Sequence, residues 1–247
     1  MKKTTSFSFM LICTFFFCTL FPSAGTAAIR NYLGSWDLNG NGKLEQVFQH
    51  NGTSIEVVSQ GKSTLHPITN PVWQLAAVAD TNGTLGAELI VKAGDHLQVI
   101  HHKSGSSSEY PVFNGSWEVV GTANTNKHQG EEVTMTAGYN LKVISDSSQT
   151  ANEDHITKGV WSVRGIADTN NQPGSEIAVK AGNDLKIIHD STKTVKTYPM
   201  STSAQFWTIE GVTDTDGKAG AEVVMSVGDD LIIVRDLSGA KKSYQIR

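Results

Sequence analysis

Residues 79–91 read ADTNGTLGAELIV, and the frame of this stretch occurs five times along the chain. The other copies are DLNGNGKLEQ from Asp37, NTNKHQGEEV from Asn124, DTNNQPGSEI from Asp168 and DTDGKAGAEV from Asp214. The first residues of successive copies stand 43, 44, 44 and 46 positions apart. A fixed period in this range is typical of a repeat architecture. We therefore expect one structural unit per repeat.

The first 28 residues stand outside the repeats and have the form of a secretory signal peptide. Lys2 and Lys3 precede an apolar run from Phe7 to Phe21, and small residues follow up to Ala28. A single membrane anchor is the alternative, but the run is short for a span of about 20 residues. We expect a secreted, extracellular protein, or a periplasmic one in a bacterium with two membranes. We expect no membrane span in residues 29–247.

The charge and cysteine content of residues 29–247 exclude several classes of partner and chemistry. Both cysteines, Cys13 and Cys18, fall within the N-terminal segment, so the remainder has no thiol and no disulfide. Without Lys2 and Lys3, 18 basic residues face 24 acidic ones, which gives a net charge of −6. A negative net charge argues against nucleic acid and anionic membranes as partners. We expect the mature chain to be a monomer.

Each repeat predicts four short strands, which we name a to d. In the second repeat these are residues 73–79, 89–93, 97–101 and a weak strand that includes 110–112. Strand a begins with Trp in four repeats and with Arg30 in the first, and in the third repeat Ile156 is the best anchor for strand d. A turn that begins with Gly joins b to c, because Gly supplies the positive φ that a tight hairpin needs. Four antiparallel strands per repeat, without helical periodicity, predict an all-β, five-bladed antiparallel β-propeller over residues 29–247.

One position of strand a holds a small residue in every repeat. These residues are Gly34, Ala77, Gly121, Gly165 and Gly211. Small residues are expected where the inner strands come closest around the propeller axis, and the alternative is that they mark β-bulges. We expect the ring to close, with residues 29–33 beside residues 244–246.

The loop frame D-x-[DN]-x-[DN]-G-x-x-[DE], followed by an apolar strand, resembles the calcium loop of FG-GAP and VCBS repeats. The resemblance to this integrin-type propeller family covers residues 29–247. It implies Ca²⁺ held by side-chain oxygens at loop positions 1, 3, 5 and 9 and by the carbonyl of position 7. Such oxygen donors suit this hard cation. The alternative is that Asp and Asn fold these turns by hydrogen-bonding their own backbone.

Two copies of the loop match the calcium pattern best. Repeat one offers Asp37, Asn39, Asn41, the carbonyl of Lys43, and Glu45; repeat four offers Asp168, Asn170, Gln172 and Glu176. The other copies are weaker because position 5 holds Thr84, His128 or Lys218. In repeats two to five the Gly also stands at position 7 rather than 6, which departs from the family pattern.

The aromatic and histidine residues favour structural roles. Four Trp at the head of strand a are either packing residues between blades or stacking platforms for sugars, and their regular placement favours packing. His101 and His189 share the end of strand c, but Ser145 and Arg235 occupy that place in other repeats. We therefore interpret the histidines as scattered surface residues.

Residues 29–247 contain no G-x-S-x-G or H-E-x-x-H motif and no thiol, which favours a non-catalytic binding protein over a secreted hydrolase or lyase. A lectin-like glycan-binding protein is the first hypothesis, and a protein-interaction or adhesion module is the second. The family that the loops resemble includes both. We expect recognition at the variable b–c turns, because binding residues concentrate on loops of a rigid scaffold. The candidates are Asp95, His96, Tyr139, Asn140, Asn183, Asp184, Asp229 and Asp230.

Overall fold

The computed structural model describes residues 29–112, 115–200 and 206–245. The signal-peptide prediction for residues 1–28 lies outside this range. All regular structure in the described residues consists of β-strands. These residues contain no helix long and apolar enough to cross a membrane.

Twenty strands form five blades. Blade 1 comprises β1 (Arg30–Trp36), β2 (Glu45–His50), β3 (Ser54–Ser59) and β4 (Lys62–Pro67). Blade 2 comprises β5 (Trp73–Ala79), β6 (Glu88–Ala93), β7 (His96–His101) and β8 (Ser106–Pro111). Blade 3 comprises β9 (Trp117–Ala123), β10 (Glu132–Ala137), β11 (Asn140–Ser145) and β12 (Thr150–His155). Blade 4 comprises β13 (Trp161–Ala167), β14 (Glu176–Ala181), β15 (Asp184–His189) and β16 (Thr194–Pro199). Blade 5 comprises β17 (Trp207–Thr213), β18 (Glu222–Val227), β19 (Asp230–Arg235) and β20 (Ala240–Gln245).

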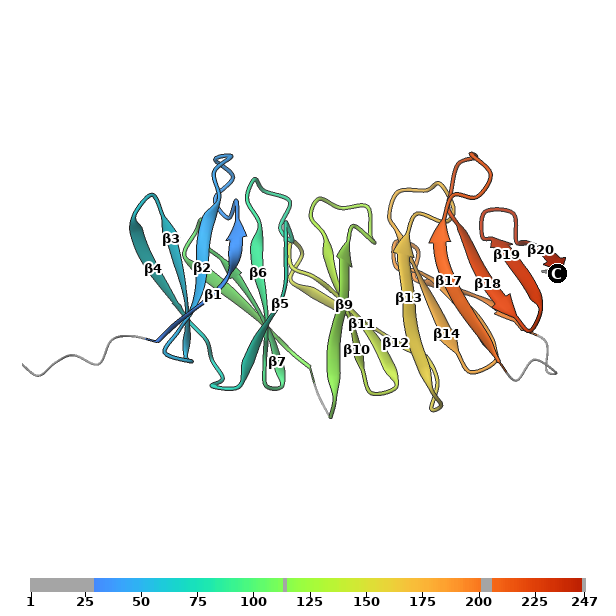
Figure 1. Ribbon diagram of the computed structural model, residues 1–247, viewed down its shortest axis with the longest axis horizontal. Coiled ribbons are helices and arrows are strands. Elements are labelled where there is room, and N and C mark those ends of the chain that lie inside the picture. Colours follow the sequence, from blue (N-terminus) through green and yellow to red (C-terminus); the bar gives the residue numbers. More distant parts are fainter. Residues whose placement is uncertain (1–28, 113–114, 201–205, 246–247) are drawn as a thin grey trace, which may run out of the picture.

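Each blade is a four-stranded antiparallel sheet whose strands follow in sequence order, which confirms the predicted five-bladed propeller fold. The a–b loops and c–d turns lie at the top in Figure 1, and the b–c turns and d–a segments lie at the bottom. We call the lower side the turn face. In blades 2 to 5 the Gly that begins the b–c turn has positive φ, as predicted; for Gly94 it is 63°. In blade 1, Asn51 precedes Gly52, and both have positive φ.

Strand d begins earlier than predicted. β8 starts at Ser106 rather than near Tyr110, and in blade 3 the strand is β12, with Ile156 directly after it. The missed residues are small or polar because this outer strand is an edge strand with exposed side chains. An apolar pattern cannot reveal such a strand.

The small residue of strand a follows a β-bulge in every blade. The register with strand b shifts by one residue just before Gly34, Ala77, Gly121, Gly165 and Gly211. The small residues therefore mark β-bulges, which was the alternative. Close approach between neighbouring inner strands is a further reason at some of these positions but not at all of them. A Cβ on Gly165 would lie 2.5 Å from Val212 of the next inner strand, whereas a Cβ on Gly211 would meet nothing within 4 Å.

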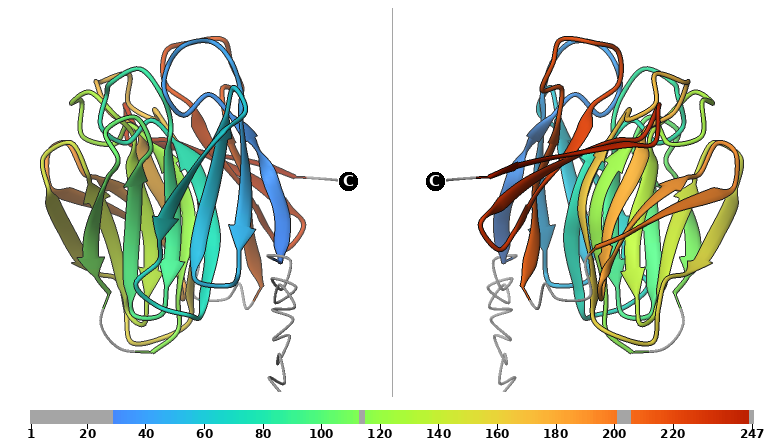
Figure 2. Two further views of the ribbon diagram at one scale, coloured as in Figure 1. Left: turned by 90° about the vertical axis from the view of Figure 1, so that its left-hand side faces the viewer. Right: turned by 90° about the vertical axis from the view of Figure 1, so that its right-hand side faces the viewer.

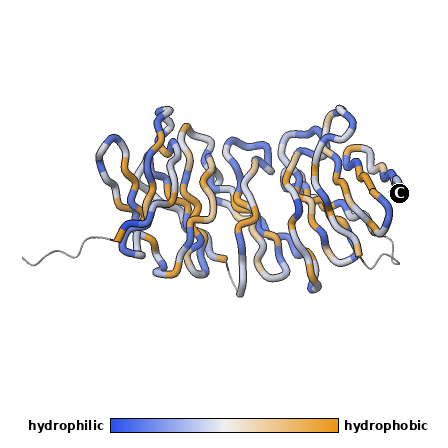
Figure 3. The backbone as a smooth tube through the Cα atoms, in the orientation of Figure 1, coloured by the Kyte–Doolittle hydropathy of each residue, from blue (hydrophilic) through white to orange (hydrophobic). Residues whose placement is uncertain are grey.

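The hydrophobic core consists of four separate layers, one between each pair of consecutive blades. Strands b and c supply most of it, with Leu89, Val91 and Ile100 of blade 2 packed on Val47, Ile55 and Val57 of blade 1. Figure 3 shows the apolar residues along the strands and hydrophilic residues in many of the connecting loops. Each blade thus uses one sheet face toward the blade before it and the other toward the blade after it.

The predicted ring closure is wrong. Blades 1 and 5 lie at opposite ends of the longest axis in Figure 1, and Figure 2 superposes them only because it looks along that axis. No core layer of the described residues joins blade 5 to blade 1. The physical reason is that blade 1 has Arg30 and Gln60 where blades 3 to 5 have the Trp and the Asp that bind the preceding blade, and blade 2 has Trp73 and His102. Those contacts are described below.

The a–b loops offer a test of how blades are held together. A Cβ on Gly220 (φ 90°) would lie 2.9 Å from the carbonyl oxygen of Thr169 in blade 4, while one on Gly217 (φ 70°) in the same loop meets nothing. We expect Gly217→Ala to cost about 1 kcal/mol of unfolding free energy through backbone strain alone. Gly220→Ala should cost at least about 2 kcal/mol because it also pushes blade 5 from blade 4. Urea unfolding of both variants measures the difference, and equal losses would contradict it.

Candidate functional site

A buried glutamate closes each a–b loop. Glu45, Glu88, Glu132, Glu176 and Glu222 are all buried, and each accepts a hydrogen bond from the backbone N–H of the second loop residue at 2.7–2.8 Å. The residue that ends strand c binds the same carboxylate: Ser59, His101, Ser145, His189 or Arg235. The glutamate therefore holds the loop, strand b and strand c of its blade together.

The calcium candidates of repeat one take part in this closure. Asp37 accepts backbone N–H groups of Gly40 and Gly42 at 2.8 Å, and the side chains of Asn39 and Asn41 each accept one from two residues on. The Asn39 amide nitrogen, not its oxygen, faces Glu45 at 2.7 Å. These oxygens are of the kind that Ca²⁺ prefers, and they already accept the hydrogen bonds that fold the loop. Calcium binding therefore stays a prediction.

Repeat four is arranged in the same way. Asp168 accepts the N–H groups of Asn170 and Asn171, and Asn170 donates to Glu176 at 2.8 Å. Gln172 is exposed, and its side-chain nitrogen donates to the neighbouring carbonyl of Asn171. The structure thus brings the side chains at positions 1, 3 and 9 of the predicted set together. The side chain of Gln172, at position 5, points away from them.

The residue after strand c links each of the last three interfaces. Asp146, Asp190 and Asp236 are buried, and each accepts a hydrogen bond at 3.0–3.1 Å from the loop Thr of the preceding blade. Tyr198 and Lys196 of blade 4 also bind Asp236, at 2.9 and 3.0 Å, and Tyr110 of blade 2 binds Asp146 at 2.6 Å. Hydrogen bonds to a carboxylate are stronger than neutral ones. These aspartates therefore fix one blade to the next.

His101 and His189 belong to this network, so their interpretation as surface residues is wrong. His189 is only 4% exposed, with Nδ1 3.4 Å from Glu176 and Nε2 3.2 Å from Asp236. His101 lies in the same way between Glu88 and Asp146. The alternation of His with Ser and Arg at this position hid the pattern. The Asp that follows the position in three repeats was the available signal.

The two carboxylates around His189 set its charge. Asp236 and Glu176 raise the pKa of His189 to about 9, so the ring is a cation at neutral pH. Burial would raise the pKa of Asp236, but hydrogen bonds from His189 and Lys196 lower it to about 2. Glu88 and Asp146 likewise raise the pKa of His101.

Within residues 29–112, 115–200 and 206–245, two groups of ligand-type side chains come together closely enough for a metal ion. They are Glu176, His189 and Asp236, and Asp214, Asp216 and Glu222. In the first group the charged imidazole and Lys196 already balance the carboxylates. In the second, Arg235 pairs with Asp216 and Glu222, and Lys218 approaches Asp216. Both groups are therefore arranged as ion pairs.

The tryptophans of strand a pack between blades, as the sequence favoured. The Nε1–H of each tryptophan donates to the carbonyl of a Gly in the b–c turn of the preceding blade, at 2.7–3.0 Å; the four are Trp73, Trp117, Trp161 and Trp207. Lys92 and Lys180 lie over the rings of Trp117 and Trp207. With Nε1 bonded and the ring covered, neither Trp117 nor Trp207 presents a free stacking platform.

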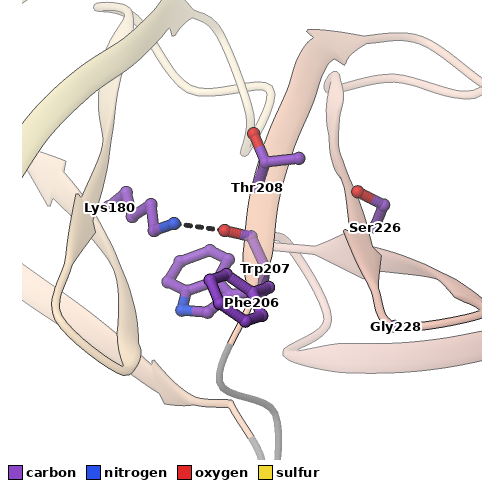
Figure 4. Close-up of a pocket in the computed structure, with 6 residues that line it drawn as sticks. All are labelled: Lys180, Phe206, Trp207, Thr208, Ser226 and Gly228. Carbon is purple, nitrogen blue, oxygen red and sulfur yellow. Dashed lines mark hydrogen bonds between the residues drawn. The ribbon is translucent and has the colours of Figure 1, made fainter.

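A cavity of about 410 Å³ opens on the turn face beside Trp207. Lys180 of blade 4 donates to the Trp207 carbonyl, and Phe206 stands in front of the indole (Figure 4). Thr208, Ser226 and Gly228 complete the lining. The cavity thus combines one exposed aromatic ring with polar groups of two blades.

A second cavity, of about 460 Å³, lies at the b–c turn of blade 3 and includes two of the predicted ligand residues. Tyr139 and Asn140 line it together with Lys142, Glu153 and His155. His155 Nδ1 lies 3.0 Å from the Asn140 oxygen, and Lys142 lies 3.0 Å from Glu153. The cavity therefore has an aromatic edge and a polar, charged floor.

The remaining predicted ligand residues stay separate. Asp95 and His96, whose Oδ1 and Nδ1 lie 2.6 Å apart, occupy the b–c turn of blade 2. The pairs Asn183–Asp184 and Asp229–Asp230 occupy those of blades 4 and 5. All of them lie on the turn face, but each pair lies at its own turn and they do not converge on one cavity.

Comparison with known proteins adds only distant similarities in structure. No protein-family model matches the chain, and no curated protein matches its sequence. BBS1N in complex with ARL6DN is similar at 14% identity and a TM-score of 0.45, over 91% of this chain and 69% of that one. An extracellular domain of BT4673 from B. thetaiotaomicron shares 13% identity at a TM-score of 0.47, over 89% of this chain and 29% of that one. The WD40 domain of SCAP from fission yeast shares 11% identity at a TM-score of 0.45, over 88% of this chain and 57% of that one. Identities this low transfer neither a partner nor an activity.

The buried histidine predicts how stability depends on pH. The pKa of His189 is about 9 in the folded chain and near 6.5 when unfolded. Its stabilising effect is therefore complete below pH 6.5 and is lost as pH rises through 9. We expect the free energy of unfolding, measured by urea denaturation, to fall between pH 6 and 9.5 by an amount on the order of 2 kcal/mol.

His189→Gln should flatten that slope, while His155→Gln, at the surface cavity, should leave it unchanged. Some decline should persist in the His189 variant because the pKa of His101 is raised too. Identical slopes in the parent and His189→Gln would contradict the assignment.

Calcium binding is tested by melting temperature. If repeat one binds Ca²⁺, millimolar calcium should raise Tm above its value in EDTA, because a ligand bound to the folded state alone stabilises it. Asp37→Ala should remove the rise, whereas Asp95→Ala on the turn face should keep it. The comparison uses the difference between calcium and EDTA, because Asp37 also holds the loop. The same Tm in both buffers for the parent chain would show plain turns.

Proposed function

We propose that this protein is a non-catalytic binding module that recognises a protein partner through its turn face. The observation that carries the proposal is a set of strongly exposed apolar side chains on that face. They are Val72 (77% exposed), Tyr139 (54%), Val160 (90%) and Phe206 (85%). Exposed apolar side chains gathered on one face of a protein commonly mark protein-interaction sites.

The position of these residues supports a rigid binding surface. Val72, Val160 and Phe206 each directly precede the Trp of strand a, whose Nε1–H is bonded to the previous blade. The scaffold therefore holds their backbone in place, which reduces the entropy lost on binding. Blade 3 has Ser116 at this position, so the surface is not five-fold equivalent. An asymmetric row suits one protein partner better than several identical small ligands.

Glycan binding is the second candidate, and the Tyr139 cavity favours it. A half-exposed aromatic ring stands above an amide, a carboxylate, an imidazole and an ammonium group within one cavity. Such a combination offers a stacking face and both donors and acceptors to sugar hydroxyls. A secreted chain, as residues 1–28 imply, would meet either kind of partner outside the cell.

The proposal is tested by side-by-side screening of a displayed library of extracellular protein domains and a glycan array. The variant Val72→Ser/Val160→Ser/Phe206→Ser should lose at least tenfold in affinity for a protein hit, because central apolar contacts dominate interface energy. The matched control is Leu44→Ser/Leu85→Ser. Both leucines are exposed at the a–b loops on the opposite face.

The outcomes separate the alternatives. If the control variant lost affinity while the turn-face variant kept full affinity, the partner would bind the opposite face, which would contradict the proposal. Glycan hits without protein hits, abolished by Tyr139→Ala, would favour the second candidate.

A further inference from the structure

The two ends of the blade array differ in character. The outward face of blade 1 carries a cluster of charges: Arg30 Nε lies 2.7 Å from Glu56, and its guanidinium stacks 4.2 Å above the ring of Phe48. His50 and Ser63 also bind Glu56, at 3.3 and 2.5 Å. Terminal units of repeat proteins commonly carry a polar outer face of this kind. Blade 1 is thus a finished end.

The outward face of blade 5 is apolar. Val224, Leu231 and Ile233 point away from blade 4 and are half-buried, outside every core layer. The residues at the same register in blade 2 are Ile90, Leu97 and Val99, all fully buried against blade 3. Blade 5 therefore presents the sheet face that every earlier blade covers with its successor.

The same face carries a set of hydrogen-bond donors for a carboxylate. In blade 4, Thr169, Lys196 and Tyr198 bind Asp236 of the next blade at 2.9–3.0 Å. Thr215, Lys242 and Tyr244 occupy the same positions in blade 5. Tyr244 is 49% exposed, and in the described part of the chain neither it nor Lys242 has a side-chain partner.

Two backbone acceptors complete this surface. In every interface, the Gly carbonyl at the b–c turn accepts the Trp Nε1–H of the next blade, and the carbonyl of the first loop residue accepts an N–H, as Asp168 does from Ala221. The corresponding carbonyls of blade 5 belong to Gly228 and Asp214. Neither accepts a hydrogen bond from another blade among the described residues.

We propose that the outward face of blade 5 docks a β-sheet of another polypeptide that presents an aspartate or glutamate to Thr215, Lys242 and Tyr244. The partner's facing side chains are apolar, to cover Val224, Leu231 and Ile233. Charge complementarity selects this occupant, because the Lys242 ammonium and the Tyr244 hydroxyl have no partner among the described residues. Thr215 donates to Glu222, as Thr169 donates to Glu176 while it also binds Asp236. A second copy of this chain fits poorly, because its exposed end offers the neutral Gln60 and the charges around Glu56.

The chain itself provides a probe of the stated chemistry. A second copy of residues 201–247 joined after Arg247 supplies a sixth blade with a Trp and an Asp equivalent to Trp207 and Asp236. We expect this extended chain to melt at least about 3 °C higher than the parent, because the added interface buries apolar surface. Hydrogen exchange should slow in β18 to β20 of the original blade 5.

Matched variants isolate the carboxylate. Replacing the Asp236 equivalent of the added blade by Ala, or Lys242 by Ala in the original blade 5, should remove at least half of the gain in Tm. Lys241→Ala, at the adjacent position of β20, should keep it. In the parent chain Lys242→Ala should leave Tm unchanged, since Lys242 has no partner there.

Three results would overturn the proposal. An unchanged Tm and unchanged exchange in the extended chain would show that the face accepts no blade. An equal gain with and without the added carboxylate would show that the three donors do not select an acid. A concentration-dependent dimer of the parent chain in light scattering, abolished by Leu231→Glu, would assign the face to a second copy.

Discussion

A buried glutamate at the ninth position of each a–b loop is the constraint on which the rest of the structure depends. A carboxylate out of water is costly unless hydrogen bonds and charges satisfy it. The backbone N–H of the second loop residue meets one oxygen, which folds the loop back on itself, and the last residue of strand c approaches the other. The folded loop then turns its Thr hydroxyl and its first carbonyl toward the next blade. One buried acid thus orders a loop and prepares an interface.

The residue at the end of strand c differs between blades, and the charge balance of the buried acids differs with it. Where the next blade brings its own buried aspartate close, as at Asp146 and Asp236, a histidine with raised pKa lies between the two acids. In blade 5 the residue is Arg235, a permanent cation, and the loop there carries the additional acid Asp216. In blade 3, Ser145 leaves Glu132 without a cation, and burial raises the pKa of that glutamate. The repeats are therefore alike in geometry but not in electrostatics.

The repeat frame allowed the blades, the bounds of strands a to c and the b–c turns to be predicted. Local rules control these features: alternation of side chains, Gly at positive φ and Trp at a fixed position. The histidines were misinterpreted because their partners, Asp146 and Asp236, lie in the following repeat, and a pattern within one repeat cannot show that contact. Strand d was predicted, but its start was placed too late, because its exposed outer residues carry no apolar signal.

Closure could not be predicted because an open array and a ring have the same repeat sequence. All four interfaces use the same hydrogen bond from Trp to a turn Gly, so their residues say nothing about whether a fifth interface exists. The decision lies in the few positions where the first repeat differs, above all Arg30 and Gln60. Arg30 binds Glu56 of its own blade, whereas the Trp at this position in other blades binds the turn of the preceding blade. The charge of Glu56 is therefore balanced within blade 1. Among the described residues, blade 5 has no such internal pairing around Tyr244, so the array has a polar end and an apolar one.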